Sequence, residues 1–81
     1  MNDVASIAFN AEVDAIGMNC PLPILRTKKA LATMQSGEVL KIKATDSGAA
    51  RDFPAFAKQT GNELIASSTE GGVLVFFLKR R

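Results

Sequence analysis

One residue of the 81-residue chain stands out for its chemistry: Cys20, the only cysteine, which is followed by Pro21 and Pro23. Proline is tolerated in the first turn of a helix because an N–H there has no partner within the helix. The prolines therefore predict a helix that begins at Pro21, with Cys20 at or near its N-cap and Gly17 in the sharp turn before it. The positive end of a helix dipole favours a thiolate. A lone cysteine is often a small buried hydrophobe, but this setting predicts an exposed, reactive thiol.

The rest of the composition restricts what this thiol can do. With one cysteine and no histidine, the chain cannot form an internal disulfide, a dithiol redox pair or a single-chain zinc site. Cys20 and Arg26 match the spacing of cysteine phosphatases, but Pro21 and Pro23 delete backbone donors that such a loop needs for phosphate. The body is small for a thiolate-ligated haem. Acyl transfer needs a neighbouring base, whereas sulfur exchange needs only a thiolate, an accessible sulfur and a partner.

The bulk properties indicate one globular domain over residues 1–81, with residues 1–6 as a frayed tail. The chain is 47% apolar and 22% charged, with a net charge of +2 and neither Trp nor Tyr. This mild charge does not predict direct nucleic-acid binding. The first ten residues resemble neither a signal peptide nor a membrane span, so we expect a protein of the reducing cytoplasm without membrane contact.

Hydrophobic periodicity predicts the elements around this thiol. Alternation over residues 7–16 predicts a strand with Ile7, Phe9 and Val13 on one face. A helical stripe follows over 21–35, with Gly37 as its stop, and residues 39–44 alternate again as a strand. Residues 46–48 form a turn. Pro54 predicts a short helical turn over 49–51 and a helix that restarts with Asp52 as N-cap and ends at Gly61. Strands over 63–69 and 73–78 are joined by a hairpin turn at 70–72.

The element order is thus β-α-β-α-β-β. Strands that alternate with helices favour parallel pairing through right-handed crossovers, and the final hairpin must be antiparallel. The predicted fold is an α/β (α+β) two-layer sandwich, a four-stranded mixed sheet with two helices on one face.

Two segments of the chain resemble the TusA/SirA-like family of small sulfur-carrier proteins. Residues 14–23, DAIGMNCPLP, are similar to the family's strand-Gly-x-x-Cys-Pro-x-Pro signature. Residues 46–54, DSGAARDFP, resemble its acidic turn followed by an Arg-Asp-aliphatic-Pro segment. The resemblance covers about residues 13–79. Some members carry a second cysteine in the second helix, where this chain has Ala57.

The resemblance implies a sulfurtransferase that acts as a carrier and has no turnover without partners. Cys20 would accept sulfane sulfur as a persulfide from a cysteine desulfurase or a rhodanese-like donor and pass it to an acceptor protein. The covalent persulfide would be its only cofactor, with no metal. The destination would be tRNA thiolation, molybdenum cofactor maturation or sulfur oxidation. A small RNA- or protein-binding module and a single-thiol redox sensor remain alternatives.

Further residues are candidates for geometry or partner binding. Gly17, Pro21 and Pro23 would set the geometry around Cys20. We expect Arg26, Lys28 and Lys29 near the thiol end of the first helix, where they would meet an acidic donor surface or only solvent. Asp46, Arg51 and Asp52 would form a structural cap and ion pair, with partner docking as the alternative role.

Overall fold

The computed structural model describes residues 7–19 and 21–81. Cys20 and the predicted tail, residues 1–6, lie outside the described residues. The elements follow one another as β1 (Ala11–Ala15), α1 (Leu22–Ala32), β2 (Val39–Ala44), α2 (Ala49–Thr60), β3 (Glu63–Glu70) and β4 (Val73–Lys79). The predicted β-α-β-α-β-β order is confirmed.

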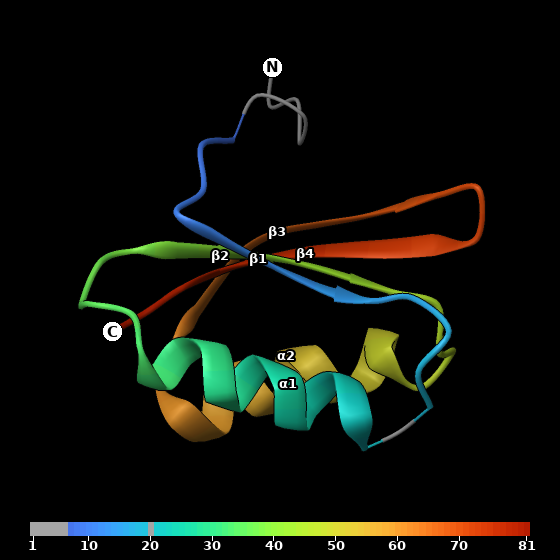
Figure 1. Ribbon diagram of the computed structural model, residues 1–81, viewed down its shortest axis with the longest axis horizontal. Coiled ribbons are helices and arrows are strands. Elements are labelled where there is room, and N and C mark those ends of the chain that lie inside the picture. The colour runs from blue at the N-terminus through green and yellow to red at the C-terminus, as the bar shows by residue number, and fades with distance from the viewer. Residues whose placement is uncertain (1–6, 20) are drawn as a thin grey trace.

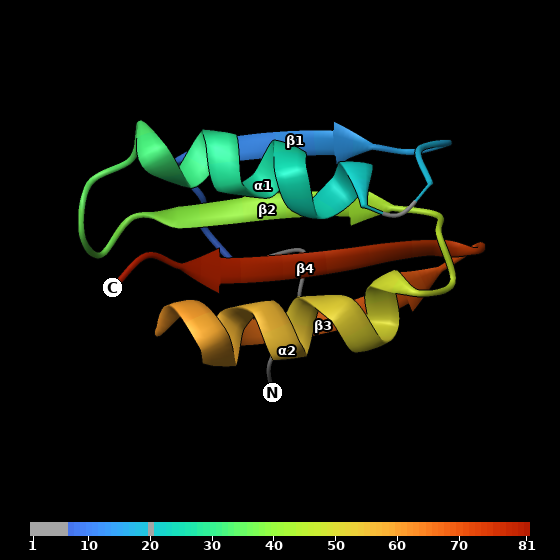
Figure 2. The ribbon, with the colours of Figure 1, turned by 90° about the horizontal axis from the view of Figure 1, so that it is seen from below.

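The four strands form one mixed sheet in the order β1-β2-β4-β3. β1 and β2 are parallel, while β4 runs antiparallel to both β2 and β3. Both helices cover the same face of this sheet, α1 over β1 and β2, and α2 over β3 and β4 (Figures 1 and 2). The two-layer sandwich is therefore confirmed, and parallel pairing is limited to the β1-α1-β2 unit.

Strict alternation in β2 separates the two faces of the sheet. Leu40, Ile42 and Ala44 are fully buried toward the helices, whereas Lys41 and Lys43 are only partly buried on the other face. The core between the layers is completed by large side chains of α2 and β4, whose Phe53 and Phe76 rings stack with centroids 4.7 Å apart.

The first strand is shorter than predicted. Pairing with β2 begins at Ala11, after Asn10, whose N–H donates to Val39 O at 2.8 Å and whose Oδ1 accepts from Val39 N at 2.9 Å. Phe9 leaves the predicted face and lies 6.3 Å from the Phe77 ring. The prediction that Ile7 and Phe9 share a core face with Val13 is wrong, because the chain bends at Asn10 toward the helix-free side of the sheet.

Helix α1 ends at Ala32, before the predicted end at residue 35. The N–H groups of Thr33 and Met34 turn back to Ala30 O and Leu31 O, each at 3.1 Å, which tightens the last turn and closes the helix. Gly37 is therefore not the helix stop. It adopts a φ of +87° in the following turn, where its N–H donates to Arg80 O at 2.7 Å.

Helix α2 runs without a break through Pro54, so the predicted restart at Asp52 is wrong. Gly48 is the N-cap, and its carbonyl accepts from both Arg51 N at 3.1 Å and Asp52 N at 2.9 Å. Pro54 and Ala50, the residue whose carbonyl it cannot bond, are both exposed, so water can satisfy that carbonyl. The helix ends at Gly61, as predicted, with a φ of +78°.

The hairpin between β3 and β4 forms as predicted, and each strand is one residue longer than expected. Gly71 and Gly72 both have positive φ values, +56° and +82°. Such a two-residue turn matches the twist of the flanking strands.

Candidate functional site

The loop that leads from β1 into α1 is held at both sides of Gly17. This glycine has a φ of +82°, and its N–H donates to Thr45 Oγ1 at 2.8 Å. Met18 N donates back to Ala15 O at 3.1 Å, which closes a turn directly after the strand. A residue with a Cβ is strained at this φ, so the sharp turn depends on glycine.

The start of α1 lies one residue later than predicted. Pro21 is the N-cap, with φ −98° and ψ 17°, and Leu22 is the first helical residue. Pro23 occupies the second position, within the first turn as expected. Cys20 lies outside the described residues, but its neighbours in the chain, Asn19 and Pro21, are both exposed.

No residue of α1 itself neutralises the positive dipole charge at the start of this helix, among the residues that the structure describes. In α1 as described, the Pro21 N-cap makes no side-chain hydrogen bond, and the first turn contains no acidic residue. A helix end without such groups presents roughly half a positive charge. This field favours a negative charge on a group placed before the helix.

Thr27 fixes the first turn to the core. Its side chain is fully buried, and its Oγ1 donates to Pro23 O at 2.8 Å. Pro23 is itself buried. The segment that follows Cys20 is thus anchored by packing as well as by the rigid prolines.

Large apolar side chains surround this loop on the outside. Ile16, Leu22 and Leu25 are 46%, 50% and 51% exposed. None of the three was predicted as a site residue. Leu22 and Leu25 are exposed on the same helix whose Pro23, Thr27 and Leu31 are buried. Large apolar side chains left exposed close together are typical of a surface that another protein covers.

Two carboxylates lie beside the start of α1. Asp46 and Asp52 line a narrow crevice together with Pro21, Pro23 and other residues of the two helix starts (Ile24, Ala49 and Phe53). Arg51 contacts Asp52 at 3.7 Å (Nε to Oδ1), but its side chain is 87% exposed. The structure thus brings Asp46 and Asp52, both predicted site residues, to the segment that holds Cys20.

The three basic residues predicted near the thiol end of α1 are not gathered there. A rise of 1.5 Å per residue places Lys28 about 9 Å along the axis from Leu22. Lys28 lines a hollow together with Arg80 and Arg81, and Lys29 lies in the last turn of the helix. Arg26 is exposed near the middle of α1. The predicted position is therefore wrong for Lys28 and Lys29, while their role in partner binding stays a prediction.

Charges divide the molecule along its length. We call the end that holds the β1–α1 loop, the β2–α2 loop and the β3–β4 hairpin the loop end, and the opposite end the tail end (Figure 1). Four carboxylates lie at the loop end, those of Asp14, Asp46, Asp52 and Glu70, together with two basic side chains, those of Arg51 and of Lys43, which pairs in register with Asp14. This acidic end replaces the basic one that the sequence analysis expected.

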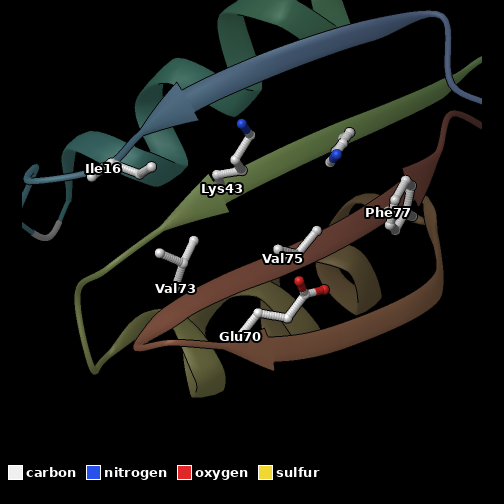
Figure 3. Close-up of a pocket in the computed structure, with 7 residues that line it drawn as sticks. Ile16, Lys43, Glu70, Val73, Val75 and Phe77 are labelled. Carbon is white, nitrogen blue, oxygen red and sulfur yellow. The ribbon is translucent and has the colours of Figure 1, made fainter. Parts of the chain in front are cut away.

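A separate hollow of about 390 Å³ lies on the helix-free face of the sheet (Figure 3). Val75 and Phe77 form its floor and Glu70 stands at one side. Lys41 also lines the hollow. The Lys43 ammonium is 3.0 Å from Glu12 Oε2, and this hydrogen bond raises the pKa of Lys43 above its ordinary value. Of the described residues that line the hollow, Ile16 is the one that borders the β1–α1 loop.

Among the described residues, no helix is both long and apolar enough to cross a bilayer.

Comparison with known proteins identifies the family. A family model described as "Sulfurtransferase TusA" matches residues 11–80. The sulfur carrier protein TusA of Allochromatium vinosum is 60% identical over 72 residues, which cover 89% of this chain and 95% of that protein. The sulfur carrier protein TusA of Pseudomonas syringae is 31% identical over 78 residues, or 96% of this chain and 93% of the relative.

The fold agrees with this assignment. The crystal structure of a SirA-like protein from Desulfitobacterium hafniense superposes with a TM-score of 0.77 at 25% identity, and the match covers 86% of this chain and 96% of that one. The Cys-Pro-x-Pro sequence, the two-layer fold and these relatives lead to one conclusion: the chain belongs to the TusA family of sulfur carrier proteins.

Proposed function

We propose that Cys20 carries sulfane sulfur as a persulfide between a donor protein and an acceptor protein. The observation that supports this most directly is the setting of the chain's only thiol: its two neighbours are exposed, and the first turn of the helix that follows contains no acidic residue. A sulfur carrier needs such a thiol, and the sequence offers no second one.

The proposed step is a balanced exchange of one sulfur atom. The Cys20 thiolate attacks the outer sulfur of a donor persulfide, a new S–S bond forms to Cys20, and the donor sulfur leaves as a thiolate. The acceptor thiolate then attacks the outer sulfur on Cys20 in the same way. No net oxidation occurs, so no redox cofactor or general base is required. The chain acts as a sulfurtransferase only when both partners are present.

The surface around the loop suggests the chemistry of these partners. A protein that approaches Cys20 would cover the exposed Ile16, Leu22 and Leu25 and would face the carboxylates of Asp46 and Asp52. Complementary surfaces place basic groups opposite acidic ones. We therefore propose that the donor, a cysteine desulfurase or a rhodanese-like protein, presents apolar side chains and basic residues around its own sulfur. A reducing compartment such as the cytoplasm would keep the thiol free for this exchange.

A two-step relay tests the proposal. The chain is loaded with a cysteine desulfurase and ³⁵S-labelled cysteine, separated from the donor, and mixed with a reduced rhodanese-like protein as acceptor. We expect the label to appear first on the chain and then on the acceptor, and Cys20→Ser to abolish both steps. Loading of Cys20→Ser to the same extent would contradict the proposal. Oxidation of Cys20 by peroxide without any sulfur loading would favour the redox sensor instead.

A further inference from the structure

A basic hollow lies at the tail end of the molecule, away from the β1–α1 loop. It has a volume of about 230 Å³, and the cationic side chains of Lys28, Arg80 and Arg81 line it. Its apolar lining includes the buried side chains of Leu31 and Phe56. Three cations from a helix and from the segment after β4 thus meet around one concave surface.

The backbone N–H groups of both arginines are hydrogen-bonded, and so is the side chain of Arg80. Arg80 N donates to Glu38 O at 2.8 Å, and its side-chain Nε donates to Leu31 O at 2.9 Å. Arg81 N donates to Asn62 Oδ1 at 3.0 Å. The side chain of Arg81 lies against Gly61, where a Cβ would be only 3.0 Å from Arg81 Cδ. An arginine whose side chain is already held, as that of Arg80 is, loses less conformational freedom when it binds a ligand.

The positive charges at the tail end outnumber the negative charges of its carboxylates and of the two helix C-termini. Lys29, Lys58 and Lys79 lie at the same end, together with the carboxylates of Glu38 and Glu63. Two helix C-termini contribute about half a negative charge each, and Arg80 already caps the carbonyl of Leu31. No carboxylate side chain is among the described residues that line the hollow.

We propose that this hollow binds a phosphoryl group, either of a free phosphate compound or of a nucleic-acid backbone. Arginine and lysine around a concave surface suit a phosphoryl group, whose oxygens accept hydrogen bonds from several directions. The hollow is separated from Pro21 by most of α1, a helix about 16 Å long. A ligand bound there leaves the Cys20 segment open, so the carrier could hold an anionic ligand while it exchanges sulfur.

The test is a titration of the ¹⁵N-labelled chain followed by amide chemical shifts, at an ionic strength kept constant with sodium chloride. Inorganic phosphate and a hexauridylate oligonucleotide are the probes that separate the two sources. We expect saturable shifts at Ala32, Asn62 and Arg81 with both. Tighter binding of the oligonucleotide, with an affinity that falls steeply with salt, would identify a backbone phosphate. Equal binding per phosphate would identify a free phosphate compound.

Variants that reverse or remove charges test whether the hollow itself binds the phosphate. We expect Lys28→Glu/Arg81→Glu to weaken phosphate binding about tenfold, the effect of losing a charge-assisted hydrogen bond. Lys28→Gln/Arg81→Gln serves as the milder variant should the double reversal disturb the fold. Arg26→Glu/Arg51→Glu changes the net charge equally at other places and should leave the affinity within twofold. Equal weakening by the control, shifts that do not saturate, or equally tight binding of hexaglutamate would each overturn the proposal.

Discussion

The carboxylates of Asp46 and Asp52 converge on one side of Gly48, the N-cap of α2. A Cβ on this glycine would lie 3.0 Å from Asp46 Oδ2 and 3.5 Å from Asp52 Oδ2. Both aspartates also line the crevice with Pro21, the residue that follows Cys20. Two negative charges therefore lie beside the segment whose helix dipole favours a thiolate, and the two effects oppose each other.

Removal of these charges should make Cys20 more reactive. A nearby like charge disfavours the thiolate, so Asp46→Asn/Asp52→Asn should raise the rate of alkylation by neutral iodoacetamide at pH 7 by about two- to fivefold. The matched control is Glu38→Gln/Glu63→Gln, which removes two carboxylates at the tail end. An unchanged rate in the aspartate variant would show that the crevice does not act on the thiol.

The buried hydroxyl of Thr27 should contribute to stability. Thr27→Val keeps the shape of the side chain but removes the 2.8 Å bond to Pro23 O, and we expect the free energy of unfolding to fall by about 1 kcal/mol. Thr33→Val is the control, because its hydroxyl bonds Ala30 O at 2.9 Å in an exposed position. Urea unfolding of both variants measures the difference. Equal losses would mean that burial of the Thr27 bond adds nothing.

Pro54 should weaken α2 without breaking it. Pro54→Ala restores the missing N–H opposite Ala50 O in the helix interior, and the free energy of unfolding should rise by about 1 kcal/mol or more. Pro23→Ala provides the contrast, because Pro23 lies in the first turn, where an N–H has no helical partner, and its ring is buried. That variant should gain nothing. A loss of stability in Pro54→Ala would indicate that the ring makes a contact the helix needs.

The Lys43–Glu12 pair should make stability depend on pH at the alkaline end. The hydrogen bond to Glu12 raises the pKa of Lys43 above its ordinary value of 10.5. A raised pKa stabilises the fold fully below 10.5, and this contribution is lost as the pH rises through the folded-state pKa. Both side chains are about one-third exposed, so the effect is small.

The contribution of the Lys43–Glu12 pair is measured by the midpoints of urea unfolding between pH 8 and pH 12. This range spans about two units around the lysine pKa. Glu12→Gln should lose less stability than the parent chain as the pH rises. Lys43→Arg should keep the pair throughout because the guanidinium stays charged. A parent chain and a Glu12→Gln variant with parallel curves would contradict the assignment.

The sequence patterns correctly predicted the elements whose shape depends mainly on their own residues. β2 follows from the alternation around Ile42, and the hairpin follows from Gly71 and Gly72, which readily adopt positive φ values. Both lie within one residue of the prediction. Pro54 misled the prediction, because exposed carbonyls can bond water and the packing of Phe53 and Phe56 on either side outweighs the lost hydrogen bond.

Features set by contacts between distant segments could not be predicted locally. The early end of α1 is stabilised by Arg80, 49 positions away along the chain from Leu31. The end of the β1 ladder depends on Asn10 meeting Val39. The carboxylates of the loop end lie near Pro21 because the β2–α2 loop packs beside it. The sequence does not show this contact, so it predicted only the basic residues of α1 near the thiol.

The central claim is that Cys20 itself holds the sulfur, and peptide-resolved mass spectrometry tests it most directly. The chain is incubated with a cysteine desulfurase and cysteine, blocked with iodoacetamide and digested. We predict a gain of one sulfur atom on the peptide that contains Cys20, and on no other peptide. A loaded chain in which that peptide carries only the carbamidomethyl group from iodoacetamide, without the additional sulfur, would contradict the account.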